Sequence, residues 1–187
     1  MNLPASVVGD ERVRLFCALQ LPLETVERLV AWQREAFAGV RDVRPLPGDH
    51  LHVTLAFLGH RPAGELDGIV AALREASTSA ERPRLSLRGY RETRSVGMLT
   101  FDDEDGRATA IASDLHERLQ ALGVYEPERR RWLPHVTVLR FRTRPRLRPA
   151  LPALEPFATS DAAAYLSRLR PGGAQYEVLE SVPVGGR

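Results

Sequence analysis

The sequence of 187 residues contains no lysine, so all 26 of its Lys/Arg side chains are arginines. A chain without lysine has no Walker-A lysine, no Schiff-base lysine and no lysine that could carry an adenylate. Codon usage in a GC-rich genome is the simplest origin of this bias, but the chemical exclusion holds in any case. Enzymes that activate their substrates through a lysine are therefore excluded.

Cysteine is almost absent, since Cys17 is the only one. One cysteine excludes an intrachain disulfide and a cysteine metal cluster. No apolar run approaches the roughly 20 residues of a membrane-spanning helix, and residues 1–10 lack the basic and apolar segments of a signal peptide. These absences predict a cytoplasmic protein with no membrane partner.

An excess of charge is also missing, because 26 basic and 24 acidic side chains leave a formal net charge of +2. That charge is too small to predict strong non-specific binding to nucleic acid. The length and composition are those of a soluble globular protein that can bury a core. We expect residues 1–187 to form a single bilobal domain and a monomer.

One short pattern, His-x-Thr-x, occurs twice, at residues 52–55 and 135–138. Each copy lies in a run of β-branched and aliphatic residues bounded by turn formers, which is typical of a strand. Because side chains alternate along a strand, His52 and Thr54 should share one face, and so should His135 and Thr137. The side chains expected to point the other way, into a core, are Val53, Leu55, Phe57, Val136 and Val138.

The rest of the chain predicts alternating strands and helices. Strands are expected at 12–21, 83–90, 96–101, 163–169 and 175–182, and helices at 22–37, 65–77 and 108–122. The proline-rich stretch 144–156 should be irregular, and residues 171–173 should form a tight turn. Since helix, loop and His-x-Thr strand recur in each half, we expect an α+β fold. It is bilobal, with two small, mostly antiparallel sheets facing across a central cleft and helices outside.

Two histidines on opposite sides of a phosphorus atom suit in-line displacement. A neutral imidazole accepts a proton from the attacking oxygen and an imidazolium donates one to the leaving oxygen. The threonine hydroxyl two residues later can donate to a non-bridging phosphate oxygen. This scheme needs no metal and no cofactor.

The sequence resembles the 2H phosphoesterases, and more narrowly the RNA 2′,3′-cyclic phosphodiesterases, also called the 2′-5′ RNA ligase family. The resemblance rests on the two motifs and on the segments RLFCALQLP, HLHVTLAFLG and LSRLRPGGAQYEVLE. It implies hydrolysis of 2′,3′-cyclic phosphates, on RNA 3′ ends or small cyclic nucleotides, to 2′-phosphates. It also implies that His52 is the proton donor to the 3′-oxygen, that His135 is the proton acceptor from water, and that Thr54, Thr137 and Arg140 bind the phosphate.

Other functions remain open at this point. The same chemistry run in reverse is ATP-independent 2′-5′ RNA ligation, and a chain with this geometry could instead be a non-catalytic RNA-end binding module. His50 and His52 have a metal-ligand spacing, but the second half offers no matching carboxylate or histidine near His135. We therefore expect no metal, and His50 at the substrate rim or on plain surface.

Several residues have two interpretations. Simple alternation puts Arg140 opposite His135, so it reaches the phosphate only if the strand ends, twists or bulges after Thr137. The arginines of 140–148 and 129–131 are either a basic rim for an RNA backbone or a solvated edge. Among the aromatic residues that could stack on a base, Phe16 and Trp132 are expected in the core and Tyr90 in either place. His60 and His116 are expected in a turn and on a helix surface, without a role.

Overall fold

The structure, a computed structural model, describes residues 12–126, 128, 130–170 and 173–185. The strands in this part are β1 Arg12–Gln20, β2 Val43–Pro45, β3 His52–Pro62, β4 Arg84–Glu92, β5 Val96–Asp103, β6 His135–Phe141, β7 Phe157–Ala158, β8 Asp161–Arg170 and β9 Gly173–Pro183. The helices are α1 Leu23–Ala36, α2 Leu66–Thr78 and α3 Arg107–Ala121, with short 3-10 turns at Gly48–His50 and Ala63–Glu65. The predicted turn at 171–173 and Arg129 fall wholly or partly outside the described residues.

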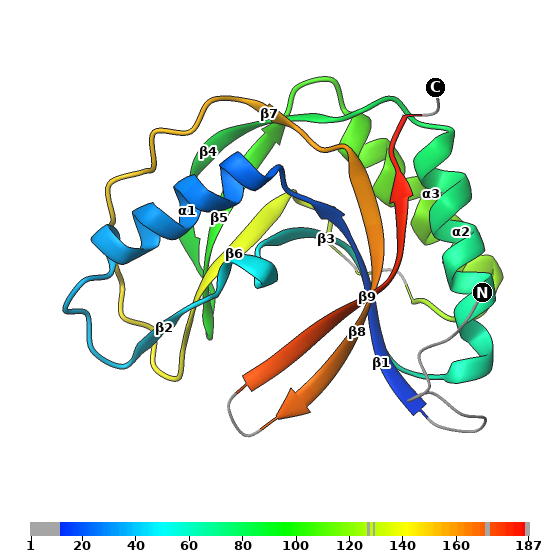
Figure 1. Ribbon diagram of the computed structural model, residues 1–187, viewed down its shortest axis with the longest axis horizontal. Coiled ribbons are helices and arrows are strands. Elements are labelled where there is room, and N and C mark those ends of the chain that lie inside the picture. Colours follow the sequence, from blue (N-terminus) through cyan, green and yellow to red (C-terminus); the bar gives the residue numbers. More distant parts are fainter. Residues whose placement is uncertain (1–11, 127, 129, 171–172, 186–187) are drawn as a thin grey trace.

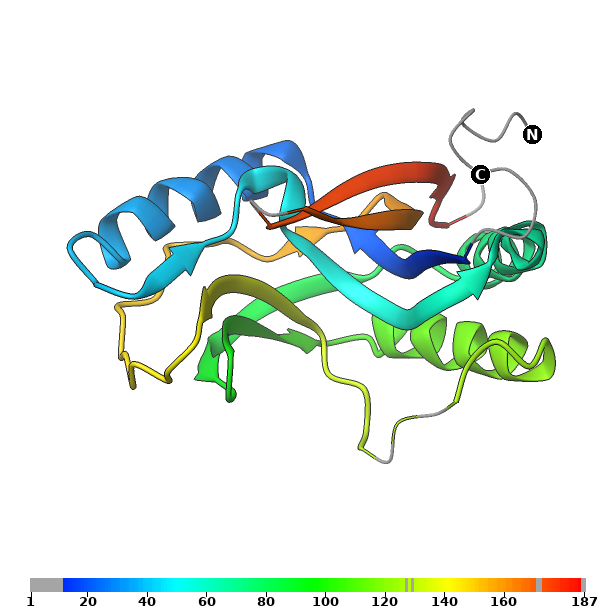
Figure 2. The same ribbon diagram turned by 90° about the horizontal axis from the view of Figure 1, so that it is seen from below.

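All strand pairs are antiparallel, in the order β7-β4-β5-β6-β3-β1-β8-β9, with β2 beside β6. The α+β class and the antiparallel pairing are thus confirmed. The two expected sheets are the two halves of one curled sheet, because β3 and β6 pair through Val53 and Val136. Figure 2 shows the bend, with β1, β3, β8 and β9 in one layer and β4, β5 and β6 in the other.

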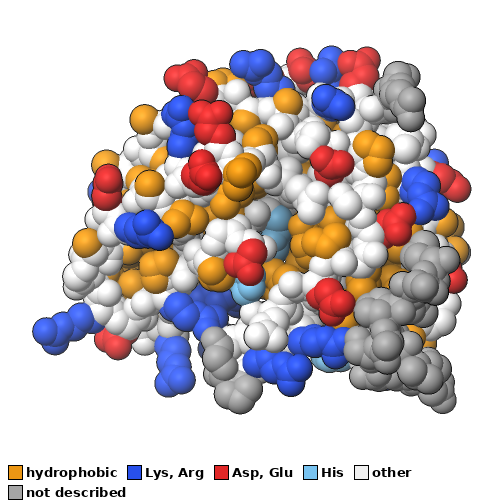
Figure 3. Space-filling view, in the orientation of Figure 1, with side chains coloured by type: hydrophobic (Ala, Val, Ile, Leu, Met, Phe, Trp, Pro, Cys, Tyr) orange, Lys and Arg blue, Asp and Glu red, His pale blue; other side chains and the backbone are white. Residues whose placement is uncertain are grey.

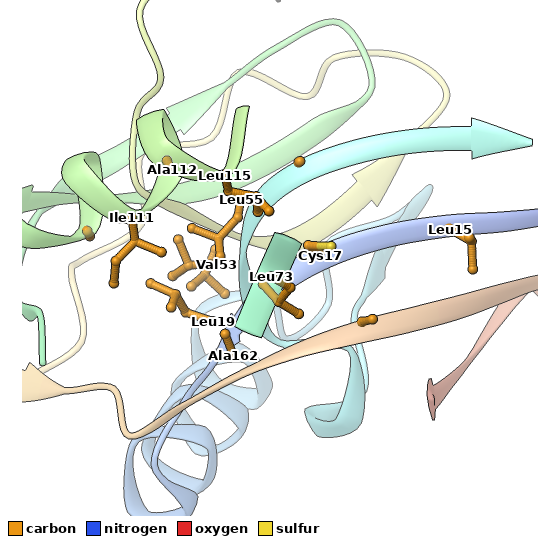
Figure 4. Packing of buried hydrophobic residues seen from close by; sticks show 14 of the residues in the cluster. Leu15, Cys17, Leu19, Val53, Leu55, Leu73, Ile111, Ala112, Leu115 and Ala162 are labelled. Carbon is orange, nitrogen blue, oxygen red and sulfur yellow. The ribbon is translucent and has the colours of Figure 1, made fainter. Parts of the chain in front are cut away.

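The main core lies between the sheet and the helices. Leu15, Cys17 and Leu19 alternate along β1 and are fully or almost fully buried on the side of α2 and α3. Figure 4 shows Val53 and Leu55 of β3 turned toward the α3 residues in this core. Helix α1 covers the other half of the sheet, and Figure 1 shows it at the opposite end from α2 and α3. None of the helices in the described ranges is long and apolar enough to cross a membrane.

Strand β1 is buried on both faces. On the side away from α2 and α3, Phe16 and Ala18 pack with Ala163 and Tyr165 of β8 in a second, smaller cluster. A strand that is covered on both faces is apolar at nearly every position, which explains the unbroken apolar run in residues 15–19. The smaller cluster forms the support under the first His-x-Thr motif.

Candidate active site

The four motif side chains share one face of the sheet, which we call the cleft face. Val53 and Val136, the middle residues of the two motifs, are completely buried and paired with each other. Their neighbours must therefore point to the opposite face. Continuing the antiparallel register by one residue in each direction sets His52 opposite Thr137 and Thr54 opposite His135. The sequence-based prediction that each motif presents its histidine and threonine together agrees with this arrangement.

Each motif strand contains a β-bulge at the third residue after its histidine. In β3, Thr54 pairs with Ala18 and Ala56 with Cys17, so Leu55 has no partner in β1. In β6, Thr137 pairs with Met98 and Leu139 with Gly97, which leaves Val138 without a partner in β5. An extra residue reverses the alternation of side chains beyond it.

The bulges change which residues reach the cleft face. Arg140 pairs with Val96, which shares a face with the partners of His135 and Thr137, so the bulge turns Arg140 toward the cleft. The same effect makes the prediction for Phe57 wrong. Phe57 pairs with Phe16, lies on the cleft face and is 49% exposed, because alternation counted through Leu55 assumed an unbroken strand.

His135 is held in one tautomer. Its Nδ1 lies 2.8 Å from the backbone oxygen of Leu133. A carbonyl oxygen only accepts, so Nδ1 carries the proton and Nε2 holds the free lone pair of the neutral ring. Nε2 is therefore the atom of His135 that can accept a proton from a reactant.

His52 lies in a drier and more positive place. Its ring stacks on Phe16 with centroids 4.9 Å apart, and the centroid of the Tyr165 ring is 5.7 Å from that of His52. The pKa of His52 is lowered to about 4, mainly by burial and also by the positive charges of His50, His135 and Arg140, whereas a contact with the backbone of His50 acts in the opposite direction. Its Nδ1 is buried and makes no hydrogen bond within the described residues. In this environment His52 is therefore a neutral imidazole at pH 7.

His50 stands at the rim, as one of its two interpretations expected. Its ring is 4.2 Å from that of Tyr176 on β9, and burial with the nearby Arg140 and Arg44 lowers its pKa while Asp49 raises it. Arginines beside a His-x-His pair repel a cation. Among the described residues no three His, Cys, Asp or Glu side chains are grouped as a metal site would require.

A pocket of about 490 Å³ adjoins the motifs through His50 and Arg140, although neither motif histidine lines it. Four arginines border it, namely Arg14, Arg44, Arg140 and Arg170, and no acidic side chain does. Figure 3 shows histidine atoms in the hollow near the centre of this face, with arginines along its lower side. A second pocket, of about 520 Å³, lies between α1 and residues 149–153 and contains no histidine.

The arginine-rich stretch after Arg140 is partly structural. The carboxylate of Glu92, whose side chain is buried, accepts from the backbone N–H groups of Arg146 at 3.0 Å and Leu147 at 2.8 Å. It also pairs with Arg144 at 3.2 Å. Glu92 thus fixes this loop. The contacts of Arg144 favour an ion pair within the protein over a contact with RNA.

The candidate aromatic residues have structural contacts. Phe16 is buried, as expected. Trp132 packs against the main core and donates its indole N–H to the Thr54 backbone oxygen at 3.0 Å. Tyr90 packs against the same core with its hydroxyl 3.3 Å from Glu92, and burial raises its pKa.

Sequence reasoning missed residues whose position depends on other strands or on a bulge. Phe57, Arg14 and Tyr176 all face the cleft region, and Arg14 lies over the Phe57 ring at 4.7 Å. One signal was available, because Phe57 follows His52 at the same offset as Arg140 follows His135. His116, expected on a helix surface, is half-buried, and its Nε2 lies 2.8 Å from the Leu55 backbone oxygen.

Two known proteins are similar to this chain in sequence. The RNA 2′,3′-cyclic phosphodiesterase of Thermus thermophilus is 32% identical over 183 residues, 93% of this chain and 91% of that protein. The RNA 2′,3′-cyclic phosphodiesterase of Escherichia coli is 32% identical over 120 residues, 64% of this chain and 54% of that protein.

Solved structures share the fold over nearly the whole chain. A crystal structure of a Thermus thermophilus protein is 30% identical with a TM-score of 0.79, covering 93% of this chain and 99% of that one. Escherichia coli LigT complexed with NADP+ is 26% identical with a TM-score of 0.78, covering 94% and 99%. The family model of the 2′-5′ RNA ligase superfamily matches residues 22–170. The chain therefore belongs to that superfamily.

Proposed function

We propose that this protein is an RNA 2′,3′-cyclic phosphodiesterase that uses His52 and His135 as an acid–base pair. The observation that carries the proposal is the pairing of Val53 with Val136, which brings two His-x-Thr motifs to one face of the sheet. The relatives named RNA 2′,3′-cyclic phosphodiesterase support the same activity.

The reaction would proceed by in-line attack at phosphorus. Nε2 of His135 takes a proton from water, the water oxygen bonds to phosphorus, and the bond from phosphorus to the 3′-oxygen breaks. His52 gives its proton to the 3′-oxygen, which leaves a 3′-hydroxyl and a 2′-phosphate. The Nδ1–H bond of His135 to Leu133 supports its role as base, because it leaves the Nε2 lone pair available.

His52 must gain a proton before it can act as the acid. Its pKa of about 4 reflects burial and neighbouring positive charges. A cyclic phosphate brings one negative charge into this environment, which favours the imidazolium and raises the pKa. Substrate binding would thus prepare His52 to act as the acid.

Thr54, Thr137 and Arg140 are suited to hold the phosphate. A threonine hydroxyl can donate to a non-bridging oxygen, and a guanidinium neutralises charge that develops on phosphorus oxygens. Neither histidine needs a metal for its step. The arginines around His50 and His52 further disfavour a bound cation at this place.

The pocket beside the motifs favours an RNA end over a free nucleotide. Arg14, Arg140 and Arg170 form no ion pair with any carboxylate of the described part, and they line a pocket without acidic residues. RNA that ends in a cyclic phosphate carries further phosphodiesters on its 5′ side, which such cations attract. The Phe57 ring is 49% exposed, and the part that the Arg14 guanidinium does not cover offers a stacking surface for a base.

The test is turnover of a short RNA with a 2′,3′-cyclic phosphate, and of 2′,3′-cyclic AMP, in EDTA. We expect both to be hydrolysed to the 2′-phosphate. A 3′-phosphate product would overturn the assignment of the acid to the 3′-oxygen. Loss of activity in EDTA that a divalent ion restores would overturn the metal-free mechanism.

The superfamily's ligase name makes the reverse reaction the second candidate. Adding an RNA with a free 5′-hydroxyl to the same assay tests it, because ligation replaces water by that hydroxyl and gives a longer RNA with a 2′-5′ linkage. Binding of the cyclic end without turnover would instead identify an RNA-end binding module.

A further inference from the structure

At each of the two bulges, the side chain of a helix residue contacts the backbone oxygen of the residue that has no partner in the neighbouring strand. The Val138 oxygen accepts from Nε2 of Gln33 at 2.6 Å and from the N–H of Leu46 at 3.0 Å. The Leu55 oxygen lies 2.8 Å from Nε2 of His116. Since a carbonyl only accepts, His116 donates through Nε2.

These contacts cross between the two halves of the chain. Gln33 on α1 precedes His52 by 19 residues, and His116 on α3 precedes His135 by the same 19. Each side chain, however, contacts the strand of the other motif. Gln33 is only 2% exposed and also donates to the Leu46 oxygen at 3.2 Å.

We propose that Gln33 and His116 are positioning residues for the reaction, each holding the bulge of the opposite motif in the form that the site requires. Without its bulge, β6 would return to simple alternation and turn Arg140 away from the cleft. A regular β3 would do the same to Phe57. Each half of the chain thereby sets the geometry of the other half's motif.

The physical reason is the cost of an unpaired oxygen. Val138 and Leu55 are buried, so no water replaces a donor that either backbone oxygen loses. Without His116 the Leu55 oxygen loses its side-chain donor, and without Gln33 the Val138 oxygen keeps only the N–H of Leu46 while the Leu46 oxygen loses its contact with Gln33. A change of register that removes the bulge then becomes less costly. A side chain of fixed length on a packed helix therefore selects the bulged form.

The test rests on the proposed function and is a double-mutant cycle between Gln33→Met and Arg140→Ala. Methionine keeps the length of glutamine and removes the donor. We expect Gln33→Met to lower kcat/KM by about tenfold in the wild-type background and by less than about threefold when Arg140 is already alanine. Equal losses in the two backgrounds would overturn the inference. A general loss of stability would lower kcat/KM by the same factor whether or not Arg140 is present.

His116 gives an independent pair of variants if Gln33→Met does not fold. His116→Gln keeps an N–H donor and loses the ring that stacks on Tyr125 at 4.6 Å, whereas His116→Leu loses both. We expect the glutamine variant to stay within about threefold of wild-type kcat/KM and the leucine variant to fall about tenfold. Equal loss in both variants would contradict the role of the hydrogen bond.

Affinity for adenosine 2′-phosphate, measured by calorimetry, gives the same comparisons without turnover. A wild-type protein that binds this product but hydrolyses no cyclic phosphate would refute the proposed function alone. Weakened binding in Gln33→Met and His116→Leu, with His116→Gln unchanged, is the expected result. Unchanged binding in all three would refute the positioning role.

Discussion

Phe57 and Arg140 occupy equivalent positions in the two halves of the molecule. Each lies five residues after a motif histidine. In each strand a bulge between the histidine and this residue turns the later side chain toward the cleft face. The cleft face therefore presents an exposed aromatic ring on β3 and an exposed guanidinium on β6. This pair is suited to a substrate with a base and an anionic phosphate.

Replacing Phe57 by alanine should weaken the binding of substrates that carry a base. Stacking of a base on an aromatic side chain is worth about 1–3 kcal/mol, so we expect KM for 2′,3′-cyclic AMP to rise by about tenfold. KM for ribose 2′,3′-cyclic phosphate, which has no base, should not change. Leu122→Ala is the matched control, because Leu122 is 51% exposed at the end of α3. Equal effects on both substrates would contradict stacking.

Replacing Arg170 by glutamine should affect RNA more than a mononucleotide. Arg170 lines the arginine pocket beside His50 and Arg140. We expect the ratio of kcat/KM for a trinucleotide ending in a cyclic phosphate to that for 2′,3′-cyclic AMP to fall several-fold. The salt dependence of RNA binding should also decrease, by about 0.7 in the slope of log K against log salt.

Arg28→Gln is the control for net charge in that experiment. Arg28 is exposed on α1 and pairs with Glu24. The Arg28→Gln substitution also removes one positive charge, but from a residue outside the pocket that Arg14, Arg44, Arg140 and Arg170 border. If both variants lower the RNA preference equally, the pocket has no special part in binding RNA.

The low pKa of His52 predicts a loss of stability in acid. Its folded pKa is about 4 and its usual value is 6.5, so between these values the unfolded chain binds a proton that the folded protein does not. The stabilisation is complete above pH 6.5 and is lost as the pH falls toward 4. We expect wild type to lose about 2–3 kcal/mol more than His52→Gln between pH 7 and pH 4.5.

Urea unfolding at the two pH values measures this difference, because the shared carboxyl groups contribute equally to both proteins. His60→Gln, which changes an exposed histidine at the far end of β3, is the control and should behave as wild type. Equal acid sensitivity of wild type and His52→Gln would show that His52 keeps an ordinary pKa.

The sequence predicts the repeating parts of this protein well. The strands and helices follow from periodicity. The histidine and threonine of each motif lie on the same face because they are two residues apart on a strand, where side chains alternate. Alternation fails where a bulge intervenes. Counted along an unbroken strand, it places Phe57 in the core, and Arg140 reaches the cleft face only through a bulge that no local residue indicates. Gln33 and His116 were equally hidden, because their partners lie 105 and 61 residues away along the chain.

The roles of His52 and His135 are tested most directly with two substrates that differ in one atom. One is an RNA ending in a 2′,3′-cyclic phosphate, and the other carries sulfur in place of the bridging 3′-oxygen, whose leaving thiolate needs no proton. We expect His52→Ala and His135→Ala each to lower turnover of the oxygen substrate by about a hundredfold or more. Sulfur should restore most of the activity of His52→Ala and none of that of His135→Ala. Rescue of His135→Ala instead would reverse the two roles, and full activity of either variant on the oxygen substrate would contradict paired-histidine catalysis.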